Sequence, residues 1–300
     1  MFLLRFSRAD AGDRRVGAGG GRGPDVVLAE PVGSCTDLVS TVIRPLLDRH
    51  GNRIELGPYP VLLKPAHARQ ALLGEPGELS VGAAYIYRKQ LEEADAVVIN
   101  RIDEVSDHEA EQLAELVREK LPHATVLKAS ARTGEGFDAI VDLLTREGSP
   151  RMAAMDVDYA LYAQGEADLG WLNATASLAG ESDAQLDYVL IDAMEWLRQA
   201  LSCASAVVAH VKMLGQQGDA QAVVNLVSTA GDVVLSKPAD AAAARARLVV
   251  NARVAMEPGS LESAVREALQ AAATAASLEI DFGNVACFQP APPQPTYRIA

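Results

Sequence analysis

Two short polar motifs, each placed directly after an apolar run, have residue types that suit a purine base. Ala96–Ile99 leads into Asn100-x-x-Asp103, and a second apolar run farther along the chain leads into Ser130-Ala131. A carboxylate at a strand end can accept hydrogen bonds from both N1–H and the N2 amino group of guanine, a pair of donors that adenine does not present. The two motifs together therefore predict a guanine pocket.

Neighbouring residues complete this predicted pocket. The Asn100 side chain can tie its own loop to nearby backbone, and a backbone N–H near Ala131 can meet O6 of guanine. Arg101 follows Asn100 directly, and its planar guanidinium can stack on the base. Two strands that end in such loops and are joined by a helix bring the loops together at the carboxyl edge of a parallel sheet.

A third motif could contact magnesium and phosphate. Glu30-Pro31-Val32-Gly33 follows the apolar run Val26–Ala29. In nucleotide hydrolases of the P-loop class, an acid at this strand end holds the magnesium shell, and a glycine three residues later donates its N–H to the γ-phosphate. The same pattern also arises by chance in ordinary loops, so both interpretations stay open. A phosphate loop of the form GxxxxGKS/T does not occur in the 300 residues.

The elements that must position these motifs alternate between strand and helix from residue 25 to residue 147. Such alternation predicts a parallel sheet covered by helices, with Val26–Ala29 as its first strand. Helices are expected over 36–50, 80–93 and 137–144, and the capping box Ser106–Glu109 predicts the start of another. The glycine-rich run at 17–23 is followed by Pro24 and then a strand, so a flexible connector is favoured there over a phosphate cradle.

The second half of the chain has a different pattern. Alternating residues over 172–178 predict a half-buried strand, and apolar residues at helical spacing predict helices over 186–201 and 260–269. With the other strand-like runs, this order predicts an antiparallel sheet with two helices on one face, ferredoxin-like in outline. The expected organisation is a flexible segment (1–24), an α/β domain (25–147), a linker (148–166), an α+β domain (167–288) and a proline-rich tail (289–300).

Composition narrows the class of protein. A chain of 300 residues with 49% hydrophobic residues is long enough for two domains. The net charge of −13 argues against nucleic acid or an anionic membrane as the main partner, since both attract basic surfaces. The three cysteines are not in CxxC spacing, which indicates neither a disulfide framework nor a compact zinc site. Without an apolar run of about 20 residues, the expected location is the cytoplasm.

Three stretches of the sequence resemble the CobW-type GTPases of cobalamin synthesis, which are metal-chaperone relatives of the nickel-insertion GTPases. They are 25–38 (DVVLAEPVGSCTDL), 85–103 (YIYRKQLEEADAVVINRID) and 130–136 (SARTGEG). The resemblance implies a partial P-loop-GTPase-like sheet with helices, followed by an α+β C-terminal domain, and it implies GTP and Mg²⁺ as ligands. By resemblance, the metal contact is Glu30, the γ-phosphate contact is Gly33, and the base contacts are Asn100, Arg101, Asp103, Ser130 and Ala131.

The chain also departs from that family. Its members begin with a strand, a GxxxxGKT loop and a helix, and then carry a CxCC motif for a transported transition metal that reaches a metalloprotein client. Neither motif occurs in this sequence. We therefore expect an N-terminally incomplete or degenerate relative, with GTP hydrolysis lost and GTP affinity weakened. Two alternatives stay open: a non-catalytic protein-binding module, and a different purine-nucleotide enzyme that shares only the sheet.

Overall fold

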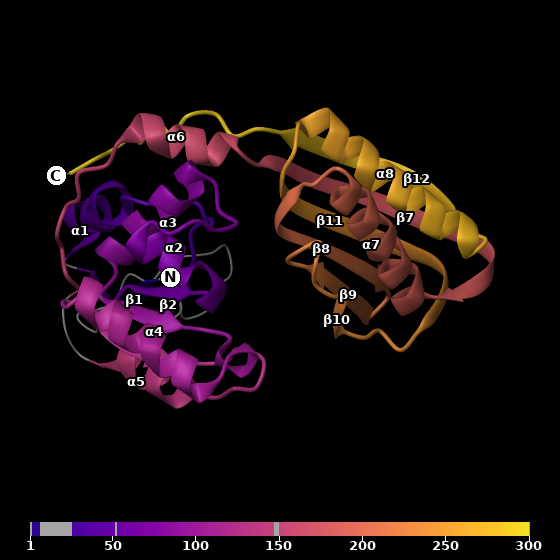
Figure 1. Ribbon diagram of the computed structural model, residues 1–300. Helices are drawn as coiled ribbons and strands as arrows, with labels where there is room; N and C mark the ends of the chain where they lie inside the picture. Colours follow the sequence, from indigo (N-terminus) through magenta and orange to yellow (C-terminus); the bar gives the residue numbers. More distant parts are fainter. Residues whose placement is uncertain (1, 7–25, 52, 147–149, 300) are drawn as a thin grey trace. The chain divides into compact units, whose positions relative to one another are not determined.

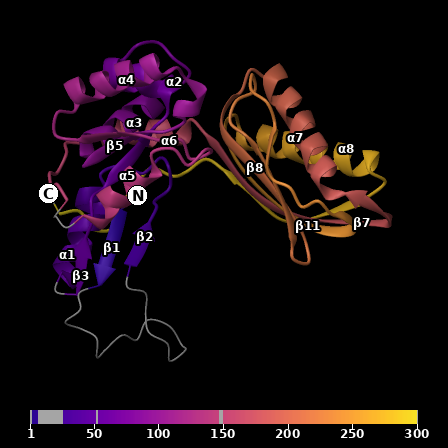
Figure 2. The same ribbon diagram turned by 90° about the horizontal axis from the view of Figure 1, so that it is seen from below.

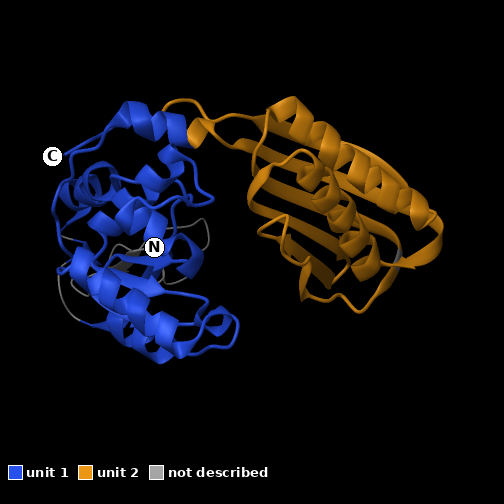
Figure 3. Ribbon diagram, in the orientation of Figure 1, with its two compact units in different colours: residues 1–165, 293–300 blue, residues 166–292 orange. Residues whose placement is uncertain are grey.

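The chain forms two compact units in the computed structural model (Figure 3). Unit 1 comprises residues 1–165 together with 293–300, and unit 2 comprises residues 166–292. The structure describes residues 2–6, 26–51, 53–146 and 150–299. The last residues of the tail thus belong with the N-terminal unit, which the sequence pattern did not indicate. None of the helices in these described ranges is long and apolar enough to cross a membrane.

Unit 1 contains the expected parallel sheet, with helices between its strands (Figure 1). Its order is β4-β5-β6, and all four residues of the central strand β5 are buried. The strands are β4 (Pro60–Leu63), β5 (Ala96–Ile99) and β6 (Thr125–Lys128), and the helices are α2 (Pro65–Leu73), α3 (Val81–Glu93), α4 (Asp107–Lys120) and α5 (Phe137–Thr145). Ser80 and Ser106 cap α3 and α4 by accepting hydrogen bonds from Ala83 N and Glu109 N. The sheet and its helices confirm the α/β prediction for this part of the chain.

The prediction that Val26–Ala29 begins this parallel sheet is wrong. That strand, β2, pairs antiparallel with β1 (Phe2–Phe6), which in turn pairs antiparallel with β3 (Ile54–Leu56), in the order β2-β1-β3. A four-residue apolar run carries no information about its partner, and β1 lies in the segment that was expected to be flexible. The glycine-rich run at 17–23 lies outside the described residues.

The helix expected over 36–50 begins later and is irregular. A π-helical turn, η2 (Val39–Ile43), leads into α1 (Arg44–His50). Asp37 has a left-handed backbone with φ of 56°, which an α-helix does not allow, so the regular helix cannot start before it. This irregular entry places the Asp37 side chain in the interior of unit 1, where it is fully buried.

The region expected as a linker, 148–166, contains most of another helix, α6 (Tyr159–Ala167). It packs closely against α3 through two glycines: a Cβ on Gly82 would lie 2.4 Å from Gly165 Cα. Val157 and Tyr162 form a small apolar cluster with Ile86 of α3. Glycines at a helix crossing let two backbones approach, and the sequence pattern did not reveal this pairing.

Unit 2 is a six-stranded antiparallel sheet with both helices on one face (Figure 1 and Figure 2). The strand order is β10-β9-β8-β11-β7-β12. Its elements are β7 (Gly170–Gln185), α7 (Leu186–Cys203), β8 (Val207–Gln217), β9 (Ala220–Leu226), β10 (Val234–Lys237), β11 (Ala242–Ala255), α8 (Pro258–Ala275) and β12 (Glu279–Phe288). Strands β7, β8, β11 and β12 with the two helices have the ferredoxin-like arrangement that the sequence predicted, and β9 and β10 extend the sheet beyond β8.

Candidate functional site

The loops that follow β5 and β6 are joined by two side-chain hydrogen bonds. Ala131 N donates to Asn100 Oδ1 at 3.0 Å, and Ser130 Oγ donates to Asp103 Oδ1 at 2.5 Å. β5 and β6 are parallel neighbours paired in register, so both loops leave the same edge of the sheet. The structure thus brings together four of the residues that the sequence analysis selected.

The Ser130 side chain holds the Asp103 carboxylate in place. Ser130 is fully buried, and its Oγ also accepts a hydrogen bond from Thr133 N at 3.1 Å. The hydrogen bond from Ser130 lowers the pKa of Asp103, and Arg132, with its Nη2 2.5 Å from Asp103 Oδ2, lowers it further. Asp103 is therefore an oriented, ionised acceptor at neutral pH.

Arg132 is the partner that a ligand would displace. Its side chain is 74% exposed, whereas that of Asp103 is 12% exposed. An ion pair in which one partner is this exposed contributes little to stability, so the guanidinium can leave Asp103 at low cost. A base with two adjacent donors could then occupy the place of the guanidinium on the carboxylate.

Two of the groups that the sequence predicted to contact the base have other partners in the structure. The Ala131 amide, expected near guanine O6, already donates to Asn100. Arg101, expected to stack on the base, has a left-handed backbone with φ of 65°, and its Nη2 lies 2.5 Å from Glu104 Oε1. Both contacts would have to be exchanged before these two groups could touch a base.

The Glu30–Gly33 turn is separate from these loops. Glu30 is exposed, and β2 before it belongs to the antiparallel sheet, so the turn does not extend from a strand of the parallel sheet. Gln90 Nε2 of α3 donates to Gly33 O at 2.7 Å and to Cys35 O at 2.9 Å. Within the described ranges, no backbone–backbone hydrogen bond links this turn to Asn100 or Asp103.

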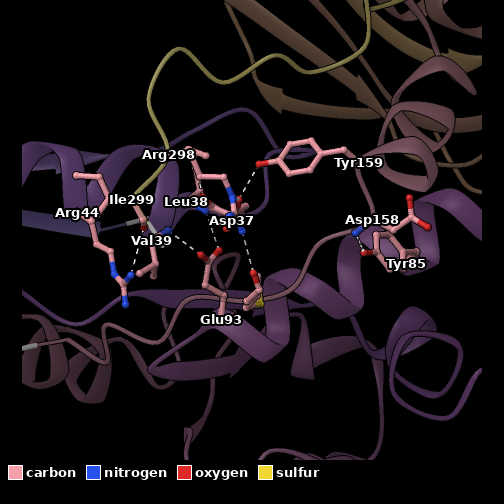
Figure 4. Close-up of polar contacts among 12 residues, drawn as sticks. Asp37, Leu38, Val39, Arg44, Tyr85, Glu93, Asp158, Tyr159, Arg298 and Ile299 are labelled. Carbon is pink, nitrogen blue, oxygen red and sulfur yellow. Dashed lines mark hydrogen bonds and ion pairs between the residues drawn. The ribbon is translucent and has the colours of Figure 1, made fainter.

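A buried carboxylate in α3 supports the peptide that follows this turn. Glu93 is 4% exposed, and its two oxygens accept hydrogen bonds from Leu38 N at 3.0 Å and Val39 N at 2.6 Å (Figure 4). Burial raises the pKa of Glu93 to about 7 against the opposing effect of these amides, and the nearby Asp37 raises it as well. A glutamate near the end of a helix gives no sign of this role in the sequence.

Raising the pH should destabilise unit 1 through Glu93. Its pKa is about 7 in the folded chain against 4.5 for an ordinary glutamate, so the folded state binds more protons between these values. Stability therefore falls as pH rises through this window, and the loss is complete above it. We expect the melting temperature to fall by roughly 5 °C more for the native chain than for Glu93→Gln.

The measurement is thermal unfolding of both proteins between pH 5 and pH 8. Histidines that titrate in the same range affect both proteins equally, so the difference between the two curves isolates Glu93. Parallel pH dependence in the two proteins would contradict the assignment.

The metal ligands expected from the resemblance are incomplete. Glu30 is the sole carboxylate of its turn, and no group of three or more His, Cys, Asp and Glu side chains in the described residues is arranged to hold a metal ion. One exposed carboxylate does not make a magnesium site, because Mg²⁺ in nucleotide enzymes is held by carboxylates together with substrate phosphates. The residues present thus do not fit a resident metal by themselves.

Comparison with known proteins gives few matches. The sequence matches no model of a protein family and no curated protein. The chain is similar to a solved structure of Zn(II)-bound YjiA GTPase from E. coli, with 13% identity over 77% of this chain and 66% of that chain, and a TM-score of 0.23. A Zn(II)-bound triple mutant of YjiA GTPase gives 12% identity with the same coverage and TM-score.

The aligned part spans just under two thirds of the YjiA structures, at 66% of their length. At that identity and score, neither likeness bears on what this chain binds.

Proposed function

We propose that unit 1 binds the base of guanine nucleotides at the loops after β5 and β6. The observation that carries the proposal is the Asp103 carboxylate, which is ionised, held by the buried Ser130, and covered on its other oxygen by the exposed Arg132. Guanine presents two adjacent donors that match this carboxylate, and adenine does not. Asn100 accepts a hydrogen bond from Ala131 N and so holds the second loop against the first, which supports a site whose two loops are positioned before a ligand binds.

The proposed contacts to the phosphates of the nucleotide have less support than those to the base. Glu30 and Gly33 are the proposed contacts for magnesium and γ-phosphate, and no GxxxxGKS/T loop occurs in the sequence to supply backbone donors and a lysine. Phosphoryl transfer depends almost entirely on such donors and on metal, so hydrolysis by these 300 residues is not proposed. The proposed activity is recognition of the base.

By the sequence resemblance, this nucleotide site belongs to a CobW-type protein. The stretches at 25–38, 85–103 and 130–136 support this assignment. We propose on that basis that the chain acts with a metalloprotein client in the delivery of a transition metal, with the nucleotide as the regulating ligand. The metal would be cargo and not a resident cofactor.

Removing the Ser130 hydroxyl should weaken the binding of GDP about tenfold, because it leaves the carboxylate less ordered and less acidic. Calorimetric titration of Ser130→Ala with GDP and with ADP at up to millimolar concentrations tests this expectation. Ser236→Ala, an exposed serine on β10 of unit 2, is the matched control and should bind GDP like the native chain. No heat with either nucleotide from the folded native chain would contradict the proposed function.

A further inference from the structure

The last residues of the chain lie as an extended segment on unit 1, and three consecutive residues each have a partner there. Ile299 N donates to Ser40 O at 2.9 Å, and Ile299 O accepts from Arg44 Nη1 at 3.2 Å. The Arg49 guanidinium lies 4.1 Å from the centre of the Tyr297 ring. Main-chain and side-chain contacts of this kind are those by which proteins bind extended peptides.

Between these two residues, Arg298 forms an ion pair with a fully buried acid. Arg298 Nε lies 2.8 Å from Asp37 Oδ2, and the side chains are 33% and 0% exposed (Figure 4). Tyr159 OH donates to the same oxygen at 2.7 Å, and Arg298 Nη2 donates to Met155 O at 3.0 Å. The guanidinium thus connects Asp37, which lies just before η2, with Met155 in the peptide that precedes α6.

The peptide that carries Asp37 depends on this charge. Asp37 Oδ1, Thr36 Oγ1 and Ser40 Oγ are buried and have no hydrogen-bond partner among the described residues. Glu93 accepts hydrogen bonds from the next two amides of the same peptide, so a second acidic side chain lies close to Asp37. A buried carboxylate that loses its cation is strongly destabilised, so the Asp37 conformation is favoured only while Arg298 is in place.

We infer that the surface formed by Asp37, Ser40, Arg44 and Arg49 is a peptide-docking site. Its occupant is the chain's own C-terminal segment, Tyr297–Ile299. Binding of this segment orders residues 36–43. The segment belongs to unit 1, although the chain reaches it from unit 2 at residue 293. The inference is independent of nucleotide binding, because it rests on contacts that do not involve Asn100 or Asp103.

Hydrogen exchange on the full-length chain tests the ordering role. Arg298→Gln should make the amides of 36–43 exchange at least about tenfold faster, since it removes the charge but keeps a polar side chain of similar shape. Arg266→Gln is the matched control, because the Arg266 side chain has an exposure comparable to that of Arg298 and pairs with Glu262 on α8 of unit 2. Unchanged exchange of 36–43 in Arg298→Gln would overturn the inference.

Binding of a separate peptide tests the docking site itself. A fluorescent peptide with the sequence of residues 293–300 should bind the full-length Arg298→Gln chain, whose own tail is weakened, roughly tenfold more tightly than the native chain, whose site is occupied. The same peptide carrying Arg298→Gln should bind neither. Equal binding of the native peptide to both chains, or no binding to either, would overturn the inference, whichever way the nucleotide experiments turn out.

Discussion

Replacing Asp103 by asparagine should weaken GDP binding about 100-fold or more and create binding of xanthosine diphosphate. An asparagine amide turns a donor toward the base where the carboxylate accepted, so guanine N1–H or its amino group meets an N–H and loses its partner. Xanthine carries a carbonyl oxygen in place of the amino group and can accept that new donor. Calorimetric titration of both nucleotides into the variant measures the exchange.

The control for this variant is Asp142→Asn, which neutralises an exposed carboxylate on α5 of the same unit. It should leave GDP affinity unchanged. If Asp103→Asn bound GDP as the native chain does, the carboxylate would not be the group that reads guanine, and the assignment of the pocket would be wrong.

Replacing Leu197 by alanine should lower the stability of unit 2 by about 3 kcal/mol. Leu197 lies on α7, is fully buried, and belongs to a core that also contains Leu190 and Met194 of the same helix. Truncation removes buried methyl groups and leaves a cavity that the rigid sheet beneath cannot fill. Urea unfolding, monitored by the fluorescence of Trp171 and Trp196 of unit 2, measures the loss.

The control is Gln199→Ala on the exposed side of α7, which should change stability by less than about 0.5 kcal/mol. A similarly small effect at Leu197 would contradict the ferredoxin-like packing of helix on sheet. Because both tryptophans lie in unit 2, the fluorescence signal reports the unfolding of this unit and not of unit 1.

Local motifs in the sequence predicted those strands and helices whose position can be recognised from their own residues. The Asn100 and Ser130 loops come together because parallel neighbours must end at the same edge of a sheet. The capping serine at Ser106 and the helical spacing in α7 likewise mark their elements without reference to the rest of the chain.

The sequence did not predict in the same way which strands pair with each other or which helices pack together. β2 has the apolar run of a parallel strand, yet it pairs antiparallel with β1, whose residues were expected to be flexible. α6 was expected as linker because its packing depends on the contact between Gly82 and Gly165, which is a property of two helices together.

The buried ion pair of unit 1 could not be predicted from the sequence either. Asp37 and Arg298 are separated by nearly the whole chain, and only folding brings them together. No local spacing can indicate such a pair. The same is true of Glu93 and the two backbone amides that donate hydrogen bonds to it. The proximity of the Asn100 and Ser130 loops could therefore be predicted, while the contacts that order the peptide after Glu30–Gly33 could not.

The most direct test of the central claim, that this chain reads the guanine base without a phosphate cradle, is a comparison of dissociation constants for guanosine, GDP, GTP and ATP with magnesium present. The account predicts that the three guanine ligands bind within roughly tenfold of one another and that ATP binds much more weakly, because the base supplies most of the recognition. GTP that bound about a thousandfold more tightly than guanosine, or ATP that bound as well as GTP, would contradict it.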